Sequence, residues 1–233
     1  MPIIVSRYKY LDALTTAFVV ILLVSNLVAQ KVCLIGPFAV SGAILLFPIT
    51  YIFGDVFTEV YGFAASRRAI WLGFFGTALL YLMGSLTIAL PPAPGWHNQQ
   101  AFATVFGFIP RILGASLIAF WAGEFANSYT MARLKLITEG RMLWTRTIGS
   151  TIVGQAVDTT LVVLLTFGGT VPIAVLGNMM ATGYMLKVGY EVLATPVTYL
   201  VIHGLKRAEG SDPFDRHQNF NPFSFSGNRN VEK

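Results

Sequence analysis

Residues 148–167 read IGSTIVGQAVDTTLVVLLTF, and this stretch decides the fold. Apart from Gln155 and Asp158, its twenty residues are apolar, small or hydroxylic, which is the length and composition of a helix that crosses a bilayer. Asp158 lies close to the centre of the stretch. A charge at that depth costs at least about 2.5–3.5 kcal/mol, so it rarely persists there without a partner or a task. The stretch therefore predicts a membrane helix with a functional acid.

Five other stretches near twenty residues have the same character, and together with the first they predict six membrane spans. They are residues 11–30, 42–61, 70–90, 102–127 and 175–202. Of the 233 residues, 55% are hydrophobic and only 12% are charged, about half the charged share of a soluble domain. We expect an all-α polytopic membrane protein, with a six-helix transmembrane domain over residues 1–207 and a cytoplasmic tail without fixed structure over 208–233.

Lysine and arginine gather on one side of this predicted arrangement. The N-terminus, the loops at 67–68 and 129–146 and the residues after the last span, which ends at 202, hold thirteen of the 16 basic residues. The positive-inside rule then places both termini in the cytoplasm, with the chain in the bacterial inner membrane. The same rule accounts for the net charge of +5, so we expect lipid beside these loops and no nucleic acid partner.

Several functional classes have no support in the sequence. Cys33 is the single cysteine, and the three histidines do not have metal-ligand spacing, so we expect no disulfide, metal or cofactor. No nucleotide-binding Gly-x-x-x-x-Gly-Lys pattern occurs, and any energy from ATP would have to come from other subunits. Carboxyl groups in a membrane also suggest an intramembrane enzyme, but aspartyl-protease patterns are absent, and we expect no catalytic residues.

The predicted spans carry seven ionisable residues, and helical spacing places several of them on common faces. Tyr51, Asp55 and Glu59 follow one another at intervals of four residues and share one face of the second span. The carboxyl groups outnumber the basic groups in the full set, which is Asp55, Glu59, Arg111, Glu124, Asp158, Lys187 and Glu191. Because burial disfavours ionised carboxyl groups, such an excess predicts bound protons, a cation or a ligand rich in N–H donors.

Depth along the spans predicts a polar chamber that opens to the outside and ends near mid-membrane. Its expected lining, from the outer half to the middle, is Asn26, Gln30, Arg111, Asp55, Asp158 and Lys187. Following Arg111, the small residues Ala115, Ala119 and Gly123 recur every four positions and predict the close approach of a neighbouring helix.

Structural roles are the alternatives for three of these groups. Glu59 would pair at the membrane surface with the basic residues at 67–68. Lys187 and Glu191 would form an ion pair within one helix. Arg111 would extend its side chain outwards to the membrane surface.

An ordered set of short motifs across the spans resembles the queuosine precursor transporter family, also called the vitamin uptake transporter family. The motifs are Ser25-Asn26, Phe47-Pro48, Asp55, Glu59-Val60-Tyr61-Gly62, Arg67-Arg68, Arg111, Ala115-Ser116, Gly123, Gly154-Gln155-Ala156-Val157-Asp158-Thr159, Lys187-Val188 and Pro196. The resemblance covers residues 10–205. It implies import of deazaguanine bases for tRNA queuosine salvage, and a fold similar to the substrate-binding component of energy-coupling-factor importers. Import of another small vitamin-like molecule is the alternative.

Matching the residues to such a base gives each a role. Asp55 or Asp158 would accept from ring N–H groups, and Arg111, Asn26 or Gln155 would donate to the ring carbonyl. The expected substrate-binding set is Asn26, Gln30, Phe47, Tyr51, Asp55, Arg111, Gln155, Asp158 and Lys187, and the expected proton-coupling or gating set is Glu59, Glu124 and Glu191. The expected partners are the base, membrane lipid, and either a second copy or energising subunits.

Overall fold

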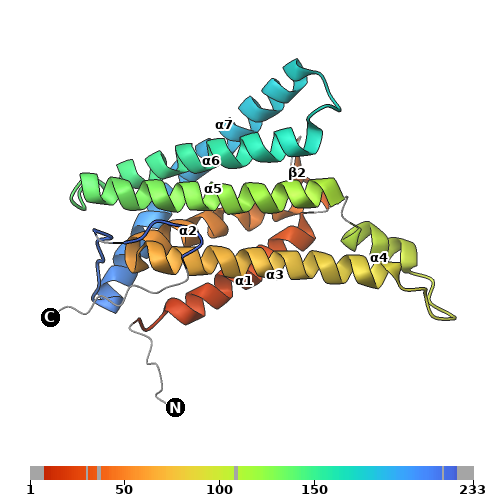
Figure 1. Cartoon of the computed structure of the whole chain (residues 1–233), viewed down its shortest axis with the longest axis horizontal. Helices are drawn as coiled ribbons and strands as arrows, with labels where there is room; N and C mark the ends of the chain where they lie inside the picture. The colour runs from red at the N-terminus through yellow and green to blue at the C-terminus, as the bar shows by residue number, and fades with distance from the viewer. Residues whose placement is uncertain (1–7, 30, 36–37, 108–109, 217, 225–233) are drawn as a thin grey trace, which may run out of the picture.

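The computed structural model describes residues 8–29, 31–35, 38–107, 110–216 and 218–224. It is almost entirely helical, and the long helices run back and forth beside one another (Figure 1). The elements are α1 (Leu11–Val28), β1 (Val32–Ile35), β2 (Phe38–Ser41), the 3-10 helix η1 (Gly42–Leu45), α2 (Phe47–Tyr61), α3 (Phe63–Ala89), α4 (Gln99–Phe106), α5 (Pro110–Ile137), α6 (Leu143–Phe167) and α7 (Ile173–Glu209).

Five segments are long and apolar enough to cross a membrane: Leu11–Val28, Phe63–Ala89, Gln99–Ile137, Leu143–Phe167 and Ile173–Glu209. Large apolar side chains are exposed along them, such as Leu193 at 80% and Leu200 at 75% on α7. Such surfaces suit a lipid environment, and backbone polar groups are satisfied within each helix. The structure thus agrees with a helical multi-pass membrane protein.

Two predicted spans differ in detail from the helices observed. The second is the 15-residue α2, which η1 precedes; Pro48 lies in its first turn, where a missing N–H does not interrupt the helix. Pro48 therefore marks the start of a helix and does not kink the second span. The predicted span 102–127 covers parts of two helices, the end of α4 and the first part of α5, which begins at Pro110.

A small hairpin is an addition to the expected all-α fold. Strands β1 and β2 pair antiparallel, with Val32 opposite Ser41 and Ile35 opposite Phe38. β-Branched residues on both strands favour this extended pairing. The hairpin connects α1 to η1 and α2.

Helix α2 is the centre of the bundle, in contact with α1, α3, α5 and α7. Its residues 54–61 are all buried. Aromatic side chains fix its contact with α1, where Phe18 packs edge-on against Phe57 at a ring distance of 5.6 Å. A polar residue on α2 therefore meets other protein elements, not lipid.

The first residue of α1 and the last of α7 lie at the same end of the bundle (Figure 1). The Glu209 carboxylate accepts hydrogen bonds from the backbone N–H groups of Lys9 and Tyr10, both at 2.8 Å, and from the Tyr61 hydroxyl at 2.8 Å. These bonds join the beginning of α1, the end of α2 and the end of α7.

The tail is ordered where the structure describes it, contrary to the expectation for 208–233. Residues 208 and 209 belong to α7, and residues 211–224, apart from 217, form a segment that we call the C-terminal strap. Asp215 accepts from the backbone N–H of Phe63 at the start of α3, at 2.9 Å. Arg67 donates to the carbonyls of Asn219 and Asn221, each at 3.0 Å. Because polar contacts hold this extended segment in place, it needs no apolar periodicity, and the sequence pattern therefore does not predict its fixed conformation.

Candidate functional site

A close crossing of α5 and α6 brings several of the predicted polar residues together. A Cβ atom at Gly123 would lie 2.7 Å from Asp158 Cβ, and one at Gly154 would lie 2.7 Å from Asn127 Cβ. Only glycine allows the two backbones to approach so closely. The small-residue stripe predicted on α5 is confirmed here, with Ala115 and Ala119 also buried.

Helix α2 presents its polar face to this crossing. A Cβ atom at Gly54 would lie 3.1 Å from Glu124 Oε2 and 3.8 Å from Asn127 Nδ2, so α5 side chains contact the α2 backbone. Asn127 interacts with the side chain of Asp55, which is 1% exposed. One turn earlier on α2, the Tyr51 hydroxyl interacts with the Gln155 amide of α6.

Helix α7 is the fourth helix, after α2, α5 and α6, that contributes side chains to these polar contacts. Lys187 forms an ion pair with Asp158 of α6, and Glu191 interacts with the Thr151 hydroxyl. Lys187 thus pairs with α6, and the alternative ion pair with Glu191 within α7 is not observed among the described residues. We call the assembled set the polar cluster, and its members are Tyr51, Asp55, Glu124, Asn127, Gln155, Asp158, Lys187 and Glu191.

The polar cluster has more acceptors than its own donors satisfy. Among the described residues, Asp55 Oδ1, Asn127 Oδ1 and Gln155 Oε1 are buried without a hydrogen-bond partner. An unpaired buried acceptor costs about 1–3 kcal/mol, so three in one place indicate a site that takes a hydrogen-bond donor. Four carboxyl groups also meet one ammonium group, which would give a net charge of −3 if all were ionised.

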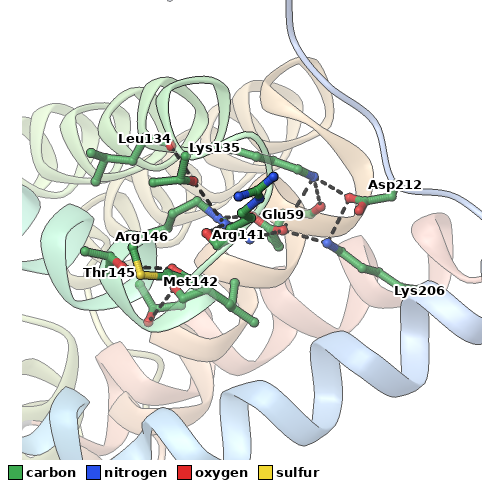
Figure 2. A network of polar contacts seen from close by, with 12 residues as sticks. Glu59, Leu134, Lys135, Arg141, Met142, Thr145, Arg146, Lys206 and Asp212 are labelled. Carbon is green, nitrogen blue, oxygen red and sulfur yellow. Dashed lines mark hydrogen bonds and ion pairs between the residues drawn. The ribbon is translucent and has the colours of Figure 1, made fainter.

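Glu59 belongs to a separate network at the end of the bundle where α2 ends (Figure 2). Its carboxylate is 0% exposed and accepts from Arg146 at 2.8 and 3.1 Å and from Lys206 at 2.6 Å. Lys135 donates to the Glu59 backbone carbonyl at 2.9 Å. The alternative pairing of Glu59 with residues 67–68 does not occur: Arg67 binds the strap, and the exposed Arg68 lies 4.0 Å from Asp12.

The strap contributes to this Glu59 network through Asp212. The Asp212 carboxylate accepts from Lys135 at 2.6 Å and lies 2.8 Å from the Lys206 ammonium. Burial alone would raise the pKa of Asp212, but the hydrogen bonds and charges of the two lysines together outweigh burial and hold the pKa below its ordinary value. The network therefore joins two carboxylates, Glu59 and Asp212, to three cations, Lys135, Arg146 and Lys206, and its net charge is +1.

Two predicted site residues lie away from the polar cluster. Asn26 donates to the Leu22 carbonyl and accepts from the Tyr81 hydroxyl at 2.9 Å, which uses its amide between α1 and α3. Arg111 is exposed and donates to the carbonyls of Leu165, at 2.8 Å, and Gly168, so it caps the end of α6. Leu165 is about 10 Å along α6 from Asp158. Gln30 and the Phe47 side chain fall outside the described residues.

The sequence alone predicts no role for Asn127 or for the basic residues around Glu59. Asn127 lies at the end of a predicted span, and its spacing of four residues from Gly123 is the signal that places it on the same helical face. The predicted spans leave Lys135 and Arg146 in a cytoplasmic loop and Lys206 after the last span. They belong instead to the long helices α5, α6 and α7, whose ends extend beside the end of α2.

Comparison with known proteins agrees with this architecture. A family model described as "Putative vitamin uptake transporter" matches residues 41–201. The chain belongs to the vitamin uptake transporter family. The matched region contains the whole polar cluster and ends before Lys206 and the strap. No solved structure matches the chain.

Two curated relatives carry a more specific name. The chain is 33% identical over 146 residues to the "Probable queuosine precursor transporter" of Bacillus subtilis (strain 168), a match that covers 62% of this chain and 64% of that relative. It is 24% identical over 200 residues to the "Queuosine precursor transporter" of Escherichia coli (strain K12), covering 85% and 87%. The match therefore spans just under two thirds of the Bacillus relative. Both relatives are named as transporters, which supports the expectation that this family member is not an enzyme.

Proposed function

We propose that this member of the vitamin uptake transporter family imports 7-deazaguanine bases, the precursors used for tRNA queuosine. One observation carries the proposal: the polar cluster holds the unpaired acceptors of Asp55, Asn127 and Gln155 among four helices. The names of the two relatives supply the identity of the substrate. Binding of the base at the cluster is the central claim.

The chemistry of the base suits the cluster. A guanine-like ring presents a ring N–H beside an exocyclic amino group, and adjacent donors of this kind match carboxylate and amide oxygens. Asp55 and Asn127 would accept from this edge. Lys187, once released from Asp158, would donate to the ring carbonyl, and Tyr51 offers an aromatic face for stacking.

The wider arrangement follows from the same proposal. Helix α2, extended by η1, would be the sixth span, and residues 1–207 would form the transport domain, similar to the substrate-binding component of energy-coupling-factor importers. Thirteen basic residues on one side favour an inner-membrane protein with both termini in the cytoplasm. The C-terminal strap and the Glu59 network would then close the cytoplasmic end, with Glu59 as a gating residue.

The carboxyl groups of the cluster also favour a coupling role. Glu124 and Glu191 lie close enough to Asp55 and Asp158 to interact with them electrostatically, so four carboxyl groups share the single ammonium group of Lys187. Proton coupling would follow if a proton entered this acidic site together with the base. Energising subunits or a second copy of the chain are the alternative sources of directionality.

Queuosine in tRNA provides the test. The host should lack both its own synthesis of the precursor and its own importer, and it should receive a limiting concentration of external base. The wild-type chain should restore queuosine, and Asp55→Asn and Asp158→Asn should each restore much less at equal membrane abundance. If the wild-type chain reaches the membrane and restores none, the substrate assignment fails.

Import of another small vitamin-like molecule is the second candidate, because the family description names vitamin uptake. Competition separates the two. Uptake of labelled 7-deazaguanine is measured with an excess of unlabelled 7-deazaguanine or of vitamins. Loss of uptake with the unlabelled base, but not with the vitamins, would favour the first candidate.

A further inference from the structure

Buried polar atoms without a partner continue along α6 beyond the polar cluster. Gln155 Oε1, Thr159 Oγ1 and Thr166 Oγ1 all lack a hydrogen-bond partner within the described part of the chain. Their spacing of four and seven residues corresponds to one and two helical turns, so the three lie on one face of α6. Each side chain is at most 8% exposed. This face leads from the cluster towards the end of α6 that Arg111 caps.

A pocket lies on this path, between α6 and α7. Its volume is about 200 Å³, and it is lined by Ala156, Thr159, Thr160, Met180, Ala181 and Tyr184. Figure 1 shows α7 crossing α6 at an angle, so the two helices do not pack along their whole length. Ala156, Thr160 and Ala181 are exposed, and the pocket therefore opens at the surface of the bundle.

The inner end of this pocket adjoins the polar cluster. Thr159 follows Asp158 directly, and Lys187 is three residues after Tyr184, so the Asp158–Lys187 ion pair joins the two helices beside the pocket. Gln155 is one turn from Thr159. Gly183 of α7 faces Thr159 at this point, because a Cβ atom there would lie 3.5 Å from Thr159 Cγ2, an ordinary van der Waals contact.

We propose that the pocket between α6 and α7 is an entry subsite for a planar, nitrogen-containing ring, with the Thr159 hydroxyl as its polar contact. The inference rests on the proposed import of 7-deazaguanine bases. Ala156, Met180 and Ala181 offer apolar walls, and Tyr184 offers an aromatic face for the ring. A threonine hydroxyl both donates and accepts, so Thr159 can bond either edge of the base. Opening of the Asp158–Lys187 pair then admits the ring to the cluster.

Cysteine accessibility in proteoliposomes tests the subsite without relying on transport. Cys33 is the single cysteine, so Cys33→Ser gives a background without thiols, and Thr160→Cys is added in the pocket. The control is Leu186→Cys, on another face of α7, where Leu186 is 70% exposed. A water-soluble methanethiosulfonate should label Thr160→Cys and leave the lipid-facing control unlabelled. Free 7-deazaguanine at about ten times its Kd should slow the labelling about tenfold, because it occupies most of the sites.

Uptake kinetics in the otherwise native chain give a second measurement. Thr159→Val keeps the shape of the side chain and removes the hydroxyl, which should raise KM about three- to tenfold, as expected for one lost neutral hydrogen bond. The matched control is Thr87→Val, which removes an exposed hydroxyl that donates within α3.

The outcomes separate the two proposals. If the wild-type chain takes up 7-deazaguanine but Thr160→Cys is unlabelled, or is labelled without protection by the base, the subsite is overturned while the proposed function stands. An unchanged KM for Thr159→Val removes Thr159 as the polar contact. Absence of uptake by the wild-type chain overturns the proposed function itself.

Discussion

Replacement of Glu59 by glutamine should strongly destabilise the protein, because three buried or half-buried cations depend on its carboxylate. Glu59 accepts from Arg146 and Lys206, and its Oε1 lies 3.5 Å from the Lys135 ammonium. Glu59→Gln keeps the size of the side chain but leaves only the Asp212 carboxylate for the three cations. The net charge of the network then rises from +1 to +2.

Breaking a buried ion pair by removing one partner costs about 3–5 kcal/mol. For a chain of this size, 1 kcal/mol corresponds to about 2–4 °C in Tm, so Glu59→Gln should lower Tm by roughly 6–20 °C. Thermal unfolding of the full-length protein in detergent, followed by intrinsic fluorescence, measures the shift. The exposed Asp12–Arg68 pair gives the control, and Asp12→Asn should change stability by about 0–1 kcal/mol.

A double variant sharpens the measurement. In Glu59→Gln the buried Arg146 guanidinium loses its carboxylate partner, and Arg146→Met removes that unpaired cation. The two substitutions together should therefore lower the free energy of unfolding by less than the sum of their separate effects. A Glu59→Gln protein whose Tm lies within 2 °C of the Asp12→Asn control would refute the view that Glu59 holds this end of the bundle together.

Three further predictions concern the crossing, the strap and the topology. Gly154→Ala should lower both Tm and uptake, because its Cβ would lie 2.7 Å from Asn127 Cβ. The control Gly114→Ala has open space around its Cβ and should leave Tm unchanged. Equal Tm values for the two variants would contradict the close crossing of α5 and α6. The pKa of Asp212 is lowered in the folded protein, so its stabilising contribution is present above the unfolded value near 3.8 and is lost as pH falls through the folded value. Between pH 5 and pH 3, Tm should therefore fall more steeply in the wild-type protein than in Asp212→Asn, and parallel curves would count against this contact. Reporter fusions at Pro94 and at the C-terminus should report opposite compartments, and agreement between them would refute the topology.

Sequence reasoning grouped the residues that helical spacing alone places together. Tyr51 and Asp55 share a face of α2, and Gln155 and Asp158 are three residues apart on α6. It failed where pairing depends on the relative positions of helices. Asn26 was expected to line the chamber, yet its amide bonds Tyr81 on α3, a neighbour that hydropathy does not reveal.

The ends of the helices were the second difficulty. The positive-inside rule assigned Lys135, Arg146 and Lys206 correctly to one side of the predicted arrangement but treated them as loop and tail residues. Because α5, α6 and α7 extend past the predicted spans, these side chains are held rigidly and reach Glu59. The strap escaped prediction for a related reason: its backbone carbonyls meet Arg67 and Trp71, contacts that leave no periodic signal.

Calorimetric titration of the purified full-length protein with 7-deazaguanine tests the central claim most directly. The account predicts saturable binding by the wild-type protein and by Asp12→Asn. Asp55→Asn should bind about ten- to a hundredfold more weakly, as expected for the loss of a charge-assisted hydrogen bond in a buried site. Asp55→Asn that binds as tightly as the wild-type protein, or a correctly folded wild-type protein that does not bind the base, would contradict the assignment of the polar cluster as the substrate site.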